Sequence, residues 1–152
     1  MRIGFRGELL DEPVVRAGFI GCGSHAFRNI YPALQFAPVR LTAVCDLDLA
    51  KARAFAAQFG AARAYHDHRQ MLADGGLDAA FVVTNYDERG RPRFPGLAVD
   101  CLRAGCHVWI EKPPAATVAE IAAMQAAAAA AGRTVMIGFK KMLPPPTRRP
   151  AS

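Results

Sequence analysis

Residues 16–29 of this chain read RAGFIGCGSHAFRN, an apolar run followed by a glycine-rich turn and the start of a helical pattern. The run over residues 14–20 suits a buried strand. Gly21, Gly23 and Ala26 then form a Gly-x-Gly-x-x-Ala pattern. Gly21 permits a tight turn, Gly23 lets a pyrophosphate approach the backbone, and Ala26 lets the helix pack close to the sheet. The stretch therefore predicts a dinucleotide-binding turn whose phosphates face the helix N-terminus.

The same turn contains three further residues that can contact a phosphate: Cys22, Ser24 and His25. We expect Cys22 to offer its backbone N–H and to take part in no thiol chemistry. Ser24 is a suitable N-cap for a helix over residues 24–36. His25 either contacts a phosphate or remains a solvated loop side chain. These residues complete the predicted phosphate-binding set.

The length and composition of the chain favour one globular domain. It has 152 residues, of which 52% are hydrophobic, enough for one buried core. We expect an arm over residues 1–13, a domain over residues 14–139 and a disordered, basic, proline-rich tail over residues 140–152. No apolar run is long enough to span a membrane, and the first residues lack the apolar centre of a secretory signal. A cytoplasmic protein with reduced cysteines is therefore expected. The cysteines are Cys22, Cys45, Cys101 and Cys106.

The net charge of +6 raises the question of nucleic-acid binding. Four of these charges lie in residues 140–152, which contain no acidic residue, so the rest of the chain is close to balanced. A second basic cluster at residues 89–93 is offset by Asp87 and Glu88. Neither cluster has the interleaved aromatic residues of a nucleic-acid module. We therefore expect no nucleic-acid partner.

Strand-like and helix-like patterns alternate along the domain. Strands are expected at residues 14–20, 39–45, 61–65, 79–84, 106–110 and 134–138, and helices at residues 24–36, 49–59, within 66–74, 96–104 and 118–131. Pro32 should bend or break the first helix, and Thr117 and Glu120 form a capping box for the last. The alternation predicts an α/β fold, namely a doubly wound, mostly parallel Rossmann sheet of about six strands with helices on both faces.

An acidic residue, Asp46, stands at the end of the second predicted strand. An acid at this place accepts hydrogen bonds from both hydroxyls of an adenosine ribose and repels a ribose phosphate, which favours NAD over NADP. Helix capping is the alternative role for Asp46, but Asp48 already fills it. Lys51 and Arg53 lie nearby and keep NADP possible.

The ends of the fourth and fifth predicted strands carry further polar residues. Thr84 and Asn85 end the fourth strand, where they contact the pyrophosphate or nicotinamide half of a dinucleotide or simply cap the loop. Glu111, Lys112 and Pro113 follow the fifth strand at the same edge of the sheet. A lysine beside a glutamate can hydrogen-bond a substrate hydroxyl or help to move its proton. A charged pair after a strand is also common on a solvated surface, so the spacing alone leaves both roles open.

A metal site is not expected. His66, Asp67 and His68 are consecutive residues in a predicted loop. Consecutive loop side chains seldom converge on one ion, and no fourth ligand is apparent.

Taken together, these motifs resemble the N-terminal domain of the Gfo/Idh/MocA oxidoreductases, the glucose–fructose oxidoreductase and inositol dehydrogenase type. The resemblance covers residues 17–139 and includes the glycine turn, residues 45–46, residues 77–79 and, most specifically, the block GCHVWIEKP at residues 105–113. It implies NAD(P)-dependent hydride transfer involving sugars, cyclitols or related polyols. It also implies that Lys112 is the catalytic residue, in contact with substrate and nicotinamide, and that Glu111 lies against the cofactor.

The chain departs from the family pattern in two places. The family has a threonine-proline pair and a downstream histidine after the fourth strand, whereas this chain has Thr84-Asn85-Tyr86, a charged insert and then Phe94 in the place of the histidine. The family's C-terminal α/β domain supplies the substrate pocket, a catalytic histidine and the oligomer interface. That domain is absent from these 152 residues, so we expect a truncated cofactor half that is weakly active or inactive alone.

Two other functions remain open from the sequence. A non-catalytic module would sense NAD, or would use apolar surface left uncovered to bind a partner chain or form an oligomer. A defunct gene fragment would have no selected role. The expected partners are a nicotinamide dinucleotide and, where a second domain supplies a pocket, a small polyol or sugar.

Overall fold

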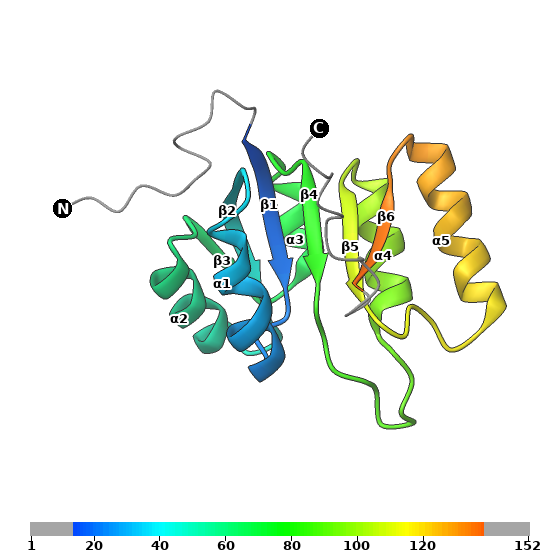
Figure 1. Ribbon diagram of the computed structural model, residues 1–152, viewed down its shortest axis with the longest axis horizontal. Helices are drawn as coiled ribbons and strands as arrows, with labels where there is room; N and C mark the ends of the chain where they lie inside the picture. Colours follow the sequence, from blue (N-terminus) through cyan, green and yellow to red (C-terminus); the bar gives the residue numbers. More distant parts are fainter. Residues whose placement is uncertain (1–13, 139–152) are drawn as a thin grey trace, which may run out of the picture.

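The computed structural model of the protein describes residues 14–138, and the predicted arm at residues 1–13 and tail at residues 140–152 lie outside this range. Strands and helices alternate along it (Figure 1). None of the helices in this range is long and apolar enough to cross a membrane. The elements are β1 (Val15–Ile20), η2 (Ala26–Ile30), α1 (Tyr31–Leu34), β2 (Val39–Cys45), α2 (Leu49–Phe59), β3 (Arg63–Tyr65), α3 (His68–Ala73), β4 (Ala79–Val82), α4 (Phe94–Arg103), β5 (His107–Glu111), α5 (Val118–Ala131) and β6 (Val135–Gly138).

The strands form one parallel sheet in the order β3-β2-β1-β4-β5-β6. The chain builds outward from β1 to β3 on one side, then returns to build β4 to β6 on the other. The strand order therefore reverses between β1 and β4, and ligands of such sheets bind outside the carboxyl ends of the strands at this switch point. The predicted doubly wound Rossmann sheet is confirmed.

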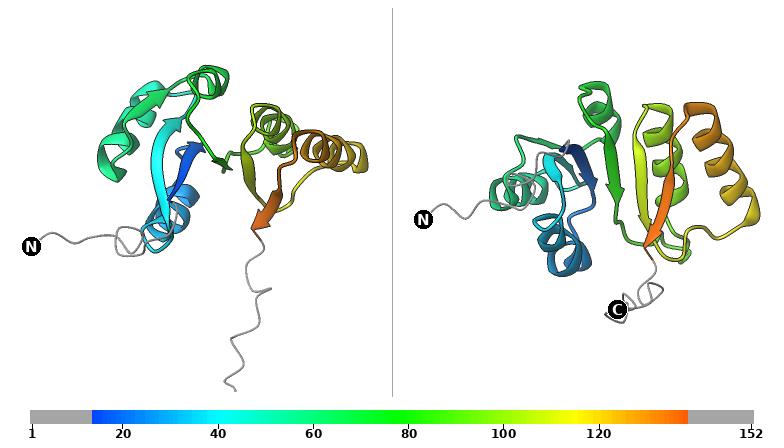
Figure 2. Two further views of the ribbon diagram at one scale, coloured as in Figure 1. Left: turned by 90° about the horizontal axis from the view of Figure 1, so that it is seen from above. Right: turned by 45° about the horizontal axis from the view of Figure 1, so that its top comes forward.

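Helices cover both faces of the sheet (Figures 1 and 2). Successive strand side chains point to opposite faces, so Phe19 joins the core beneath η2, α1 and α2 while Ile20 joins the core beneath α3, α4 and α5. The Tyr31 ring stacks on Phe19 with the ring centres 3.9 Å apart and on Phe59 with the centres 4.6 Å apart. These aromatic contacts hold the first helical segment between the sheet and α2.

The first helix, predicted at residues 24–36 with a bend or break at Pro32, changes its hydrogen-bond pattern along its length. It widens into the π-helical segment η2, where the Tyr31 N–H donates to the Ala26 carbonyl, and only then becomes the short α1. Pro32 has no N–H to donate within this helix, so the backbone hydrogen-bond pattern changes beside it. The π-helical turn precedes Pro32 and the chain stays helical through residues 24–34, so no break occurs at Pro32 itself.

Three boundaries near the carboxyl edge of the sheet also differ from the prediction. β4 ends at Val82, so Thr84 lies in the following loop. α4 begins at Phe94, two residues before the predicted start, because Pro95 fits the first turn, where its missing N–H costs nothing. β5 reaches Glu111, which pairs in register with Gly138 of β6.

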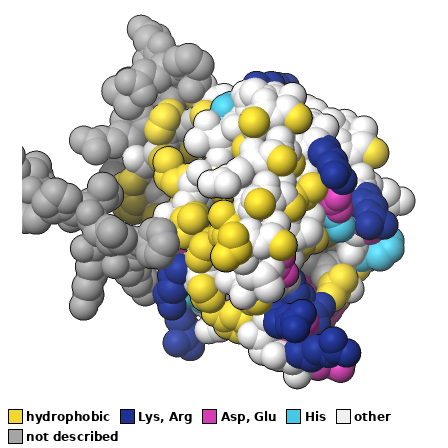
Figure 3. Space-filling view, turned by 90° about the vertical axis from the view of Figure 1, so that its right-hand side faces the viewer, with side chains coloured by type: hydrophobic (Ala, Val, Ile, Leu, Met, Phe, Trp, Pro, Cys, Tyr) yellow, Lys and Arg dark blue, Asp and Glu magenta, His cyan; other side chains and the backbone are white. Residues whose placement is uncertain are grey.

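The half of the sheet formed by β5 and β6 is covered on one side only. α4 and α5 lie on one side, and no described helix lies on the other (Figure 2). Trp109 and Met136 are register partners there, and the Met136 side chain is 61% exposed. On the covered side, the outer surface of α5 is mostly alanine. Figure 3, which views the molecule from the α5 end, shows small hydrophobic side chains scattered there.

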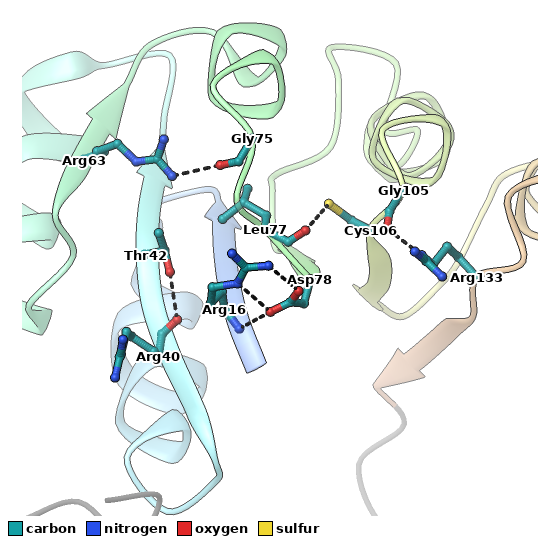
Figure 4. A network of polar contacts seen from close by, with 10 residues as sticks. All are labelled: Arg16, Arg40, Thr42, Arg63, Gly75, Leu77, Asp78, Gly105, Cys106 and Arg133. Carbon is teal, nitrogen blue, oxygen red and sulfur yellow. Dashed lines mark hydrogen bonds and ion pairs between the residues drawn. The ribbon is translucent and has the colours of Figure 1, made fainter. Parts of the chain in front are cut away.

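Polar contacts tie the strands together at their amino ends, the edge opposite the switch point (Figure 4). The Arg16 guanidinium donates to the Asp78 carboxylate at 2.8 and 3.0 Å, and the Arg16 backbone N–H donates to it at 2.8 Å. These hydrogen bonds lower the pKa of Asp78 to about 2. Arg133, which precedes β6, donates to the Gly105 carbonyl before β5. These residues join neighbouring strands and have a structural role.

Candidate functional site

A cavity of about 790 Å³ opens at the carboxyl ends of β1, β2 and β4. It lies at the switch point of the sheet and is within the size range of small-molecule sites. Its walls come from the glycine turn, the end of β2 and the loops that follow β3 and β4. Six of the predicted cofactor-binding residues line it: Gly21, Cys22, Gly23, Asp46, Thr84 and Asn85.

The two glycines of the turn have different physical roles. Gly21 has a φ of +109°, and a Cβ atom there would stand 1.9 Å from the Val83 carbonyl oxygen. The turn therefore requires glycine at this position for the fold itself. A Cβ at Gly23 would meet no protein atom within 4 Å, so its missing side chain leaves open space at the cavity wall. Gly23 is where a ligand can approach the backbone.

The Asp46 carboxylate joins the end of β2 to the glycine turn. Its Oδ2 atom accepts the Cys22 backbone N–H at 2.7 Å, and its Oδ1 atom accepts the Asp48 backbone N–H at 2.9 Å. Asp48 caps α2 by accepting the N–H groups of Ala50 and Lys51. Asp48 caps the helix as predicted, and Asp46 lines the cavity while its carboxylate holds two backbone N–H groups.

Thr84 lines the cavity, and its hydroxyl group is unpaired within residues 14–138. Its Oγ1 atom is buried and has no hydrogen-bond partner among the described residues. A buried hydroxyl without a partner is costly, since it has lost its hydrogen bonds to water. Asn85 follows Thr84 at the rim and is exposed.

The other predicted site residues do not line this cavity. Ala26 is fully buried between η2 and the sheet, where it acts through packing. Ser24 lies inside the first helical turn and not before it, so its predicted capping position is wrong. His25 Nε2 is 2.7 Å from Glu111 Oε1. Lys112 is exposed directly after β5, and the peptide bond that follows it is cis.

The cavity also contains residues that the sequence patterns did not assign to the cofactor site. His68 begins α3, Arg93 precedes α4, and Asp100 lies within α4. His68 Nε2 is 2.8 Å from Asp100 Oδ2, so the contact joins the two helices beside the cavity. His68 is distant in the sequence from Arg93 and Asp100 and shares no motif with them, so only the fold brings it beside them.

No metal site emerges from the histidine-rich loop. Asp67 caps α3 by accepting the Arg69 N–H at 2.8 Å, while His68 pairs with Asp100. Across residues 14–138, no group of three histidine, cysteine, aspartate or glutamate side chains is placed to hold a metal ion.

Two cysteine thiols border the cavity but are held in their protonated form. Cys22 and Cys45 are both buried. Burial is the main cause that raises the pKa of each thiol to about 12. Because the thiolate is the nucleophile, these groups are unreactive at neutral pH. Their place in the site is as small wall residues. The Cys22 backbone N–H, predicted to serve a phosphate, donates to Asp46 instead.

The charged insert after β4 forms a small hairpin. Asp87 accepts the backbone N–H groups of Arg89 and Arg91, and Tyr86 forms an isolated β-bridge with Pro92. The Tyr86 side chain lines the cavity. Phe94, which stands in the place of the family histidine, is 2% exposed and belongs to the core beneath α4. It does not face the cavity.

The chemistry of this cavity fits a dinucleotide. Open space at Gly23 admits a pyrophosphate, and the glycine turn leads directly into a helix. Asp46 places at the cavity a carboxylate that is held by two backbone N–H groups, and Thr84 lines the same cavity. Each feature lies on the same cavity wall or rim.

Comparison with known proteins places the chain among oxidoreductases. A family model described as an oxidoreductase family with an NAD-binding Rossmann fold matches residues 15–139. The chain is 33% identical over 138 residues to a D-xylose 1-dehydrogenase (NADP(+)) from Haloferax volcanii, and 34% identical over 134 residues to an inositol 2-dehydrogenase from Saccharopolyspora erythraea. These alignments cover 88% and 86% of this chain, but only 40% and 38% of the two relatives.

A solved structure shows the same fold. The dehydrogenase WlbA from Bordetella pertussis, in complex with NADH and UDP-GlcNAcA, matches with a TM-score of 0.71 and 28% sequence identity. The match covers 82% of this chain and 37% of that one. The chain therefore spans about two fifths of the length of the relatives that it matches.

Proposed function

The chain belongs to the Gfo/Idh/MocA oxidoreductase family, and on this premise we propose that it binds NAD(H) as the cofactor-binding part of a sugar or cyclitol dehydrogenase. The observation that carries the proposal is the hydrogen bond between Asp46 and the Cys22 N–H, beside the open space at Gly23. It holds a ribose-binding acid and a phosphate-binding turn in one rigid unit. Relatives named for D-xylose and inositol support the substrate class.

The cofactor is proposed to be NAD in preference to NADP. Asp46 would accept hydrogen bonds from the ribose hydroxyls and repel a phosphate in the same place. Its carboxylate is fixed by two backbone N–H groups, so it cannot turn away without losing both. Lys51 lines the same cavity, and one relative is named for NADP(+). NADP(H) is therefore the competitor to test.

The proposed catalytic role belongs to Lys112, which follows Glu111 at the end of β5. When bound, the nicotinamide ring supplies or accepts the hydride. Lys112 is proposed to hydrogen-bond the substrate hydroxyl and to take up or release its proton. Orienting a substrate beside Lys112 requires a second wall. We propose that the part of the relatives' length that this chain does not span provides that wall.

Calorimetric titration of the 152-residue chain with NADH and with NADPH tests this function. We expect saturable NADH binding with one site per chain and at least tenfold weaker NADPH binding, because Asp46 repels the extra phosphate. The variant Asp46→Ser, which lacks the charge, should narrow this difference. Absence of NADH binding at millimolar concentration would refute the proposal.

A second candidate function, a non-catalytic module that binds a partner chain, is favoured by the uncovered side of β5 and β6. Trp109 and Met136 lie on that side, and exposed apolar patches often mark association sites. Size-exclusion chromatography with light scattering tests the simplest form, self-association. Concentration-dependent dimers that disappear in Met136→Lys would support it, and a monomer at all concentrations would count against it.

A further inference from the structure

Hydrogen bonds among Asn29, His25 and Glu111 link the glycine turn to the end of β5, where Lys112 follows. Asn29, within η2, places its Nδ2 atom 3.0 Å from His25 Nδ1 and 3.3 Å from the His25 carbonyl oxygen. His25 Nε2 in turn lies 2.7 Å from Glu111 Oε1. The contact joins residues 86 positions apart in the sequence. In the sheet, β4 lies between β1 and β5, so the contact spans from the turn after β1 to the end of β5.

The hydrogen-bond geometry assigns the tautomer of His25. The Asn29 amide nitrogen donates to the His25 carbonyl, which fixes the orientation of the amide group, and the same nitrogen then donates to Nδ1. Nδ1 is therefore an acceptor without a proton. In a neutral imidazole the other nitrogen carries the proton, so Nε2–H donates to Glu111 Oε1. The protonated Nε2 atom of His25 therefore faces the Glu111 carboxylate.

The Glu111 carboxylate depends on this donor. Its side chain is only 14% exposed, whereas His25 is 41% exposed, so Glu111 has lost most of its contact with water. Its second oxygen accepts only a longer hydrogen bond, 3.3 Å, from the Lys112 backbone N–H. A largely buried carboxylate requires hydrogen-bond donors. His25 is the closer of its two donors among the described residues, and Lys112 follows directly.

We propose that His25, held in its Nε2–H tautomer by Asn29, is a positioning residue that fixes Glu111 and so sets the strand end carrying Lys112 relative to the glycine turn. The part of this proposal that concerns the cofactor and Lys112 rests on the proposed function. The hydrogen bonds that join Asn29, His25 and Glu111 do not depend on it. The site for the dinucleotide at the glycine turn and the site for the substrate at Lys112 would thus be positioned relative to each other before either ligand binds.

The tautomer is tested without any ligand. Long-range proton–nitrogen NMR correlation on labelled wild-type protein should show His25 with a bare Nδ1 and a protonated Nε2 whose proton exchanges slowly with water. In Glu111→Ala this proton should exchange rapidly, and in Asn29→Leu the two tautomers should mix. A wild-type His25 with its proton on Nδ1, or with freely interconverting tautomers, would overturn the inference.

The functional consequence is tested by NADH affinity, followed through quenching of Trp109, the single tryptophan of the chain. His25→Ala should weaken NADH binding about tenfold, the effect of one lost charge-assisted hydrogen bond. His25→Gln, which keeps an N–H donor, should restore affinity to within about twofold. His107→Ala removes an imidazole from the opposite end of β5, where its Nδ1 accepts the Thr134 N–H, and should leave affinity unchanged.

The two readouts separate failure of this inference from failure of the proposed function. Unchanged affinity in His25→Ala, or no rescue in His25→Gln, would overturn the positioning role while leaving NADH binding intact. If the wild-type chain does not bind NADH, the proposed function fails, and the NMR measurement alone then decides whether His25 holds Glu111.

Discussion

The Oδ2 atom of Asp46 accepts the backbone N–H of Cys22 at 2.7 Å. This contact joins the carboxyl end of β2 to the glycine turn after β1, two segments that are also paired through the Gly21 N–H and the Cys45 carbonyl at 2.8 Å. The acid proposed to bind the ribose therefore also shapes the loop proposed to bind the pyrophosphate. Stability and cofactor affinity should respond together when this carboxylate is removed.

Asp46→Ala should destabilise the fold and weaken NADH binding. Two backbone N–H groups lose their acceptor, which costs about 1–3 kcal/mol of unfolding free energy, and the ribose loses its partner. Asp48→Ala is the matched control, since loss of this helix cap costs about 1 kcal/mol without touching the cavity. Urea unfolding measures the change in unfolding free energy of each variant, and NADH titration measures the change in its cofactor affinity. Equal NADH affinities in the two variants would show that Asp46 has no binding role.

The two glycines of the turn should separate folding from binding. Gly21→Ala forces a Cβ against the Val83 carbonyl at positive φ, and should lower the unfolding free energy by about 3 kcal/mol or more. Gly23→Ala meets open space and should change stability by less than about 1 kcal/mol, while its methyl group blocks the pyrophosphate. Thermal unfolding and calorimetry would detect this contrast, and normal NADH binding by Gly23→Ala would contradict it.

Thr84→Val should move stability and affinity in opposite directions. Valine has the shape of threonine but lacks the buried hydroxyl, which has no partner among residues 14–138. Removing the unpaired group should raise the unfolding free energy by about 1 kcal/mol and weaken NADH binding about fivefold. Thr42→Val, within β2, is the control, because the Thr42 hydroxyl already donates to the Arg40 carbonyl. A stabilised variant with unchanged affinity would assign Thr84 no contact with cofactor.

The contact between Arg16 and Asp78 should make stability fall in acid. Hydrogen bonds from Arg16 lower the pKa of Asp78 from 3.8 to about 2. A carboxylate with a lowered pKa contributes stability above its unfolded-state value, and this contribution is lost as the pH falls from about 4 towards 2. The stability difference between wild type and Asp78→Asn, measured by urea unfolding, should therefore shrink on acidification. A difference that stays constant from pH 5 to pH 2.5 would exclude this role.

The periodic pattern of apolar residues was sufficient to predict the fold. Alternating strands and helices of ordinary length, punctuated by glycine and capping residues, predict the parallel sheet and the order of its elements. The capping box of α5 formed as expected between Thr117 and Glu120. Boundaries were less predictable. Pro32 predicted an irregular first helix, but the position of the π-helical turn before it, beside the packing of Tyr31 on Phe19 and Phe59, had no local signal.

For the candidate site, the sequence determined which residues stand at the carboxyl ends of strands, because strand ends follow from local patterns. Gly21, Gly23, Asp46 and Thr84 were found in this way and line one cavity. Only the tertiary structure decided the partners: Asp46 with the Cys22 N–H, His68 with Asp100, and His25 with Glu111. The physical reason is that hydrogen bonds depend on distances of about 3 Å between atoms, and the order of strands in the sheet sets those distances for residues far apart in the chain.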